Sequence, residues 1–83
     1  LSQGFPDFPV SEELINLVTK YMKGGLNQYA PMPGVLSLRG AISEKVKFLY
    51  GANYSPDTEV TVTAGATQAL FTAIMALVKE GDE

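Results

Sequence analysis

Hydrophobic residues recur at helical spacing in three parts of this chain and alternate with polar residues in a fourth. The first helix is predicted between Ser11, a typical N-cap residue, and the glycine pair that begins at Gly24. The second is predicted from about Val35 to Tyr50, and Gly51 ends it. One face of the second helix would gather Leu38, Ile42, Val46 and Leu49.

The last third of the chain predicts a short strand followed by a helix. Valines alternate with polar residues from Glu59 to Thr63, a pattern that favours a strand. After three small residues, a helix is expected from Ala66 to Val78, and it is apolar on nearly every side. Such a helix is expected to be buried by other elements, and one strand and two amphipathic helices are too few to bury it. Residues 79–83 resemble the polar turn before a second strand, so we predict an α/β fold that belongs to a larger domain.

Composition excludes several classes of function. The 83 residues carry a formal net charge of −3, which argues against binding to nucleic acid or to an anionic membrane. The chain has no cysteine and no histidine, so it lacks a thiolate nucleophile, the commonest general base and the commonest metal ligand. No apolar run is long enough to span a membrane, and no signal peptide is recognisable, which favours a cytoplasmic protein. The start at Leu1 suggests that N-terminal residues are missing.

The turn between the predicted strand and the third helix suits an anion. The first N–H groups of a helix lack internal partners and lie at the positive end of its dipole, where phosphate binds well. Gly65 and Ala66 would let an anion approach the backbone, and the hydroxyl of Thr67 could add a donor. A plain strand-to-helix turn without a ligand is the alternative. The segment matches neither the Walker loop nor the dinucleotide-binding fingerprint.

Two further residues could touch a ligand, although the chain contains no catalytic constellation. Tyr29 lies in a polar loop before a proline-rich turn, where its hydroxyl could reach a ligand or its ring could simply pack. Gly4 could permit close backbone approach or could only form a turn. The serines have no histidine to activate them, and the lysines occupy surface positions that do not suit imine chemistry.

Five segments in order resemble one family across essentially the whole chain. They are residues 1–8 (LSQGFPDF), 27–34 (NQYAPMPG), 38–39, 61–71 (TVTAGATQALF) and 81–83. In this order and spacing they resemble the N-terminal part of fold-type I, pyridoxal-phosphate-dependent aminotransferases of classes I and II. The methionine/glutamine/kynurenine aminotransferase group is the most similar.

The resemblance implies roles for the residues singled out above. Gly65, Ala66 and Thr67 would hold the phosphate of pyridoxal 5'-phosphate. Tyr29 would reach the cofactor phosphate of the neighbouring subunit in a homodimer, and Gly4 would lie near the substrate carboxylate. Arg39 would be structural, paired with a carboxylate or capping a backbone group, rather than a clamp for the substrate. The lysine that binds the cofactor covalently would lie outside this chain.

The resemblance also implies a division of the chain and an activity. Residues 1–10 would form an N-terminal arm, residues 11–58 two helices and an interface loop, and residues 59–83 the first βα unit of the large domain. The parent protein would transfer an amino group from methionine, glutamine or an aromatic amino acid such as kynurenine to a 2-oxo acid. The 83 residues alone would be inactive.

Other functions remain compatible with the same sequence. The fold also hosts carbon–sulfur β-lyases, cyclopropane-forming synthases and aminotransferase-like transcription regulators, which the phosphate turn does not distinguish. A non-catalytic fragment that associates with itself through its apolar third helix is an alternative of another class.

Overall fold

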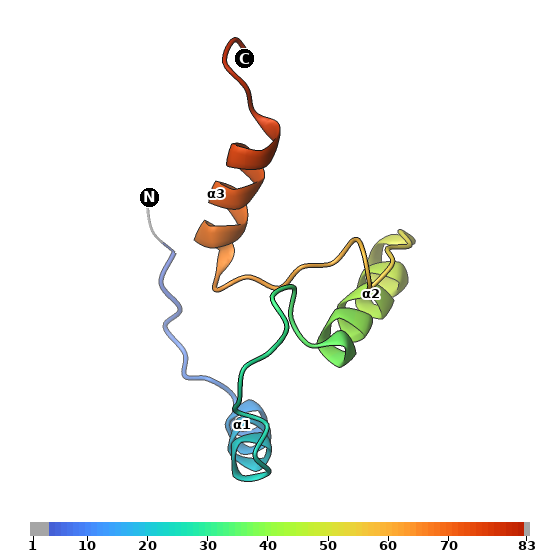
Figure 1. The fold of residues 1–83 in the computed structure, drawn as a ribbon. Helices are drawn as coiled ribbons and strands as arrows, with labels where there is room; N and C mark the ends of the chain where they lie inside the picture. Colours follow the sequence, from blue (N-terminus) through green and yellow to red (C-terminus); the bar gives the residue numbers. More distant parts are fainter. Residues whose placement is uncertain (1–3, 83) are drawn as a thin grey trace.

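A computed structural model describes residues 4–82, and three separate helices make up its regular structure (Figure 1). They are α1 (Glu12–Lys23), α2 (Leu36–Tyr50) and α3 (Ala66–Leu77). These bounds confirm all three helices predicted from the hydrophobic pattern. The first three residues of the expected N-terminal arm and the final residue of the expected terminal turn lie outside the described residues.

Helix α1 follows the capping chemistry of its sequence. The Ser11 hydroxyl accepts a hydrogen bond from the backbone N–H of Leu14 at 3.3 Å, which satisfies one free donor of the first turn. Acidic residues lie in the first turn and lysines in the last, where the helix dipole favours each charge. The N–H of Gly24 then bonds to the carbonyl of Lys20 at 3.0 Å, and the helix ends.

Helix α2 ends at a glycine and is tied to the connector after it by short-range bonds. Gly51 adopts a left-handed conformation, with φ of 69°, and its N–H bonds to the carbonyl of Lys47 at 2.9 Å. The Ser43 hydroxyl donates to the carbonyl of Tyr54, which holds the connector against the helix. The N–H of Ser55 donates to the Glu59 carboxylate at 2.7 Å, and this bond closes the next turn.

The predicted strand from Glu59 to Thr63 is wrong as a strand. Within residues 4–82 the segment lacks the hydrogen-bonded ladder of a strand. Apart from local bonds to Ser55 and Gly65, its one backbone bond to a distant part of the described residues is from the Val62 N–H to the Pro33 carbonyl, at 2.9 Å. A strand needs a neighbouring strand to pair with its N–H and C=O groups. The β-branched residues therefore indicated an extended segment correctly, but no pairing partner lies in the described part.

The three helices do not pack on one another within the described residues, and the molecule is open. The chain exposes 8057 Å², against about 4,800 Å² for a compact monomer of its mass. Its radius of gyration is 16.3 Å, against about 12 Å for a compact domain of this length. No hydrophobic side chain among residues 4–82 is buried.

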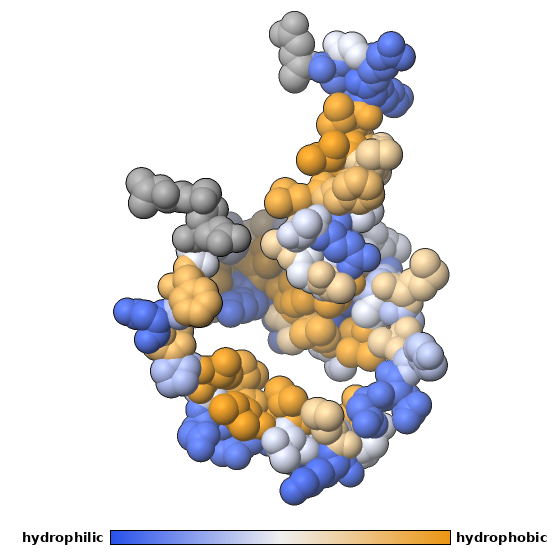
Figure 2. Space-filling model, turned by 90° about the vertical axis from the view of Figure 1, so that its left-hand side faces the viewer, coloured by the Kyte–Doolittle hydropathy of each residue, from blue (hydrophilic) through white to orange (hydrophobic). Residues whose placement is uncertain are grey.

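Exposed hydrophobic residues lie on all three helices and in the loops between them. Figure 2 shows hydrophobic side chains on the side of α1 that faces the open space, with hydrophilic ones on the opposite side. Along α3, apolar residues cover most of the circumference, and Phe71 and Met75 are about two-thirds exposed, at 65% and 67%. In the part that the structure describes, no helix is both long and apolar enough to cross a membrane.

Candidate phosphate-binding turn

The turn into α3 presents three backbone donors in a row. Gly65 is the N-cap residue, with φ of 92° and ψ of 165°, and the first helical bond runs from the Ala69 N–H to the Gly65 carbonyl at 3.4 Å. The N–H groups of Ala66, Thr67 and Gln68 precede this bond. Within residues 4–82 they have no backbone acceptor.

Other groups of the turn bond to one another and fix its shape. The N–H of Gly65 donates to the Thr63 carbonyl at 2.9 Å, and the Thr63 hydroxyl donates to the Gly65 carbonyl at 3.0 Å. The Ala64 N–H donates to the side-chain oxygen of Gln68 at 2.6 Å. The neighbouring donors are thus already used, and the next three are left for a ligand.

The surroundings of the turn suit a negatively charged group. Gly65, Ala66 and Thr67 are exposed, and the first turn of α3 contains no acidic residue. A side chain at Gly65 would meet nothing within 4 Å in this chain, so there is open space beside the backbone. Unpaired N–H groups at the positive end of a helix dipole form an anion site, and a phosphate fits this donor set.

The other two predicted ligand residues lie elsewhere in the chain. Tyr29 is fully exposed in the loop between α1 and α2, beside a shallow hollow of about 510 Å³ lined by Asn27, Gln28, Tyr29 and Ala30. Gly4 is exposed in the N-terminal arm, with open space around it. Within residues 4–82 no hydrogen bond joins either residue to the turn. The structure therefore groups Gly65, Ala66 and Thr67, and leaves Tyr29 and Gly4 apart.

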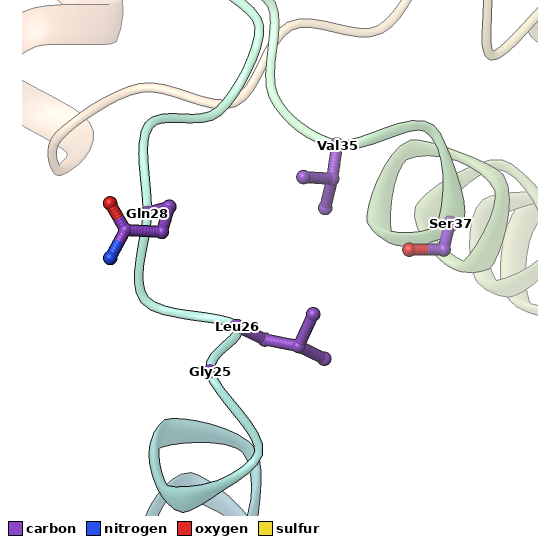
Figure 3. A pocket seen from close by; sticks show the side chains of 5 residues that line it. All are labelled: Gly25, Leu26, Gln28, Val35 and Ser37. Carbon is purple, nitrogen blue, oxygen red and sulfur yellow. The ribbon is translucent and has the colours of Figure 1, made fainter.

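A smaller hollow of about 260 Å³ lies between the loop after α1 and the start of α2 (Figure 3). Leu26 and Val35 point into it from opposite sides, and the Ser37 hydroxyl is directed toward the same space. Gly25 and Gln28 complete the lining. The lining contains no charged group, so this hollow has neither a cation for a phosphate nor a base for catalysis.

Arg39 holds the loops around α2 together. It is 8% exposed, and it is the one residue within 4–82 that is buried. Its Nε donates to the carbonyl of Gly34 at 3.0 Å, and its Nη1 donates to the carbonyls of Pro56 and Asp57 at 2.6 and 3.2 Å. The expectation that Arg39 caps backbone groups is confirmed by these three bonds.

Sequence reasoning missed the part that Gln68 plays in the turn. Gln68 is the third residue of α3, and glutamine at this position commonly reaches back to an N–H near the N-cap. Its side chain does so here by accepting from Ala64. The capping pattern could have been found by counting three residues on from Gly65.

Comparison with known proteins assigns the family of the chain. The model of the family described as aminotransferase class I and II matches residues 1–83. A methionine aminotransferase from Escherichia coli is 53% identical over 83 residues, which are all of this chain and 22% of that protein. A probable N-succinyldiaminopimelate aminotransferase from Mycobacterium tuberculosis is 42% identical over the whole chain and 21% of its own length.

Solved structures agree with the sequence comparison. The structure of YbdL from Escherichia coli, identified as a methionine aminotransferase, matches with a TM-score of 0.90 and 52% identity. The match covers 99% of this chain and 22% of that one. The N-succinyldiaminopimelate aminotransferase structure from Mycobacterium tuberculosis matches with a TM-score of 0.86 and 41% identity, over 96% and 21% of the two chains. The chain thus spans about a fifth of the length of these relatives.

Proposed function

Because the chain belongs to the class I and II aminotransferase family, we propose that it is the N-terminal part of a pyridoxal-phosphate-dependent aminotransferase. The parent protein would move an amino group from an amino acid to a 2-oxo acid. The observation that carries this proposal is the family match over residues 1–83, together with three free N–H donors at the turn where the family resemblance puts the phosphate.

In this proposal the turn into α3 binds the phosphate of the cofactor. The N–H groups of Ala66 and Thr67 donate to phosphate oxygens, and the Thr67 hydroxyl adds a further donor. Gly65 leaves the space that lets the phosphate reach the backbone. When bound, pyridoxal phosphate supplies the aldehyde and the electron-withdrawing ring that allow an amino group to change carriers.

Tyr29 and Gly4 would act at the edges of the same site. A fully exposed tyrosine on a loop is free to reach a second molecule, which supports a homodimer in which Tyr29 donates to the neighbouring subunit's phosphate. Gly4 would bring the backbone of the N-terminal arm close to the substrate carboxylate. The arm would comprise residues 1–10, with residues 11–58 forming the helices and interface loop, and residues 59–83 beginning the large domain.

We propose an amino acid such as methionine, glutamine or kynurenine as the donor substrate. The similarity to a methionine aminotransferase at 53% identity supports methionine first. A relative named as an aspartate aminotransferase, from Thermotoga maritima, is 40% identical over all of this chain, so aspartate is the competing substrate.

The test uses the full-length protein that contains this segment. We expect it to bind pyridoxal phosphate and to convert methionine to its 2-oxo acid when a 2-oxo acid acceptor is present. Release of a thiol, ammonia and pyruvate from a cysteine S-conjugate, with no 2-oxo acid acceptor present, would instead identify a carbon–sulfur β-lyase. No cofactor binding would contradict both readings. In the turn, Thr67→Ala should weaken cofactor binding about tenfold, whereas the matched change Thr72→Ala on α3 should not.

A further inference from the structure

The guanidinium of Arg39 links two loops that lie on either side of α2 in the sequence. On one side it binds the carbonyl of Gly34, and on the other it binds the carbonyls of Pro56 and Asp57. Hydrogen bonds from a charged donor are stronger than neutral ones, and burial strengthens them further. These three bonds therefore hold the two loops in one arrangement.

A second link runs from the same loop to the segment before the phosphate turn. The carbonyl of Pro33 accepts from the Val62 N–H at 2.9 Å. The α-carbon of Gly34 lies against the Val62 side chain so closely that an added Cβ would be 2.8 Å from its Cγ2. In Figure 1 this loop and the segment that leads into α3 meet near the centre of the molecule. Val62 precedes Gly65 by three residues, so the Pro33–Gly34 loop is tied both to Arg39 and to the approach to the turn.

We propose that Arg39 is a positioning residue for the cofactor phosphate. Through Gly34 and Val62 it fixes the Tyr29 loop and the phosphate turn relative to each other. The inference rests on the proposed function, because it needs the turn to bind phosphate. In the proposed homodimer the turn serves its own subunit's site and Tyr29 serves the neighbour's. The Arg39 guanidinium of each subunit would then position the phosphate turn of its own site and the Tyr29 contact of the neighbouring site.

The experiment compares two forms of the cofactor in the full-length apoprotein. Pyridoxal lacks the phosphate, so the ratio of its dissociation constant to that of pyridoxal phosphate measures the phosphate contacts alone. We expect Arg39→Met to lower this ratio about tenfold, mainly through weaker binding of pyridoxal phosphate. Arg39→Lys should recover part of the loss, since a lysine can bind some of the three carbonyls. The control, Lys45→Met, removes an exposed charge from the same helix and should leave the ratio unchanged.

The outcomes separate this inference from the proposed function. If the wild-type protein binds pyridoxal as tightly as pyridoxal phosphate, the phosphate turn itself is refuted. If the wild type prefers the phosphate and Arg39→Met keeps the same preference, Arg39 has no positioning role, although the turn stands. An equal loss of both affinities would indicate a purely structural residue and would also overturn the inference.

A measurement on the wild type covers the case in which Arg39→Met does not fold. Residues 52–60 contain none of the proposed cofactor contacts, but they include both carbonyls that Arg39 binds after α2. We expect their backbone amides to exchange hydrogen more slowly when pyridoxal phosphate is added, and not when pyridoxal is added. Unchanged exchange in this segment with pyridoxal phosphate would overturn the inference.

Discussion

Hydrogen bonds within the described residues hold the loops around α2 in place, whereas the hydrophobic surface of α3 has no such partner there. Around α2, two polar side chains bond to the backbone of neighbouring loops within the described residues: Arg39 binds three carbonyls, and Ser43 binds the carbonyl of Tyr54. Along α3, hydrophobic side chains such as Leu70 and Ile74 stay more than half exposed. Local hydrogen bonds can be satisfied by neighbours in sequence, whereas a helix that is apolar all round needs other elements to cover it.

The loops around α2 show that local hydrogen bonds can define backbone geometry even where the helices do not pack on one another. The loops that flank α2 keep their arrangement because charged and neutral donors find backbone acceptors nearby. The apolar surface of α3 contributes no burial energy within residues 4–82, since no apolar side chain there is buried. We therefore expect local geometry to come from this segment and most of the folding free energy to come from the rest of the parent protein.

The largest effect should appear when residues 1–83 are made alone. Without burial of apolar surface, the hydrophobic stabilisation gained on folding is too small to offset the loss of chain entropy. We expect no cooperative thermal transition by circular dichroism and no transamination above a heat-treated control. A sharp transition in a monomer whose sedimentation does not change with concentration would contradict this expectation.

A charge on α3 should distinguish the isolated chain from the parent protein. In the full-length protein we expect Ile74→Asp to cost about 4 kcal/mol or more, because α3 would be covered there and a carboxylate would be buried. In the isolated chain the same change should have little effect on helix content. Denaturant unfolding of the full-length variant measures the first effect, and equal stability to wild type would show that this face of α3 stays in water.

Removing the Arg39 side chain should destabilise the α2 region directly. We expect Arg39→Ala to cost the full-length protein about 3 kcal/mol, because three carbonyls lose a charged donor. Urea unfolding gives the value, with Lys45→Ala on the same helix as the control. A loss no larger than that of the control would mean that solvent replaces the guanidinium without cost.

The backbone at Gly65 should resist any side chain. Its φ of 92° and ψ of 165° fall in a region that is almost exclusive to glycine. We expect Gly65→Ala to cost about 2 kcal/mol of stability and to weaken cofactor binding. Gly40 lies inside α2, and a Cβ added there would meet nothing within 4 Å in the described chain. Gly40→Ala should therefore stabilise the protein by about 0.5–1 kcal/mol. Thermal unfolding of both variants should therefore show shifts of opposite sign.

The smallest expected effect is at the start of α1. Ser11→Ala removes the acceptor for the Leu14 N–H and should cost about 1 kcal/mol. Ser37→Ala is the matched control, since the Ser37 hydroxyl makes no hydrogen bond among the described residues. Indistinguishable unfolding midpoints for the two variants would show that water caps α1 as well as serine does.

Helices were predictable from the sequence because their signals are local. The N-cap at Ser11 and the glycines at positions 24 and 51 lie beside the residues they affect, so the ends of α1 and α2 match the predicted ends closely. The strand predicted at residues 59–63 failed because its signal is not sufficient in the same way. Its sequence determines an extended backbone, but pairing depends on a second strand elsewhere in the chain.

The candidate site was predictable only in part, for a similar reason. Small residues before a helix indicated the free donors of Ala66 and Thr67, since both features are adjacent in sequence. The carbonyls that bind Arg39 lie 5, 17 and 18 residues away, and no periodicity records such contacts. The roles of Tyr29 and Gly4 depend on other surfaces and remain predictions.

The contact between Gly34 and Val62 restricts how this sequence can evolve. Gly34 has φ of 96°, and the space for a side chain there is filled by Val62. A mutation at position 34 alone therefore meets both an unfavourable backbone conformation and a clash. Even a smaller residue at position 62 would remove only the clash. Position 34 should accordingly remain glycine in lineages where position 62 varies, and the two positions should show little compensatory exchange.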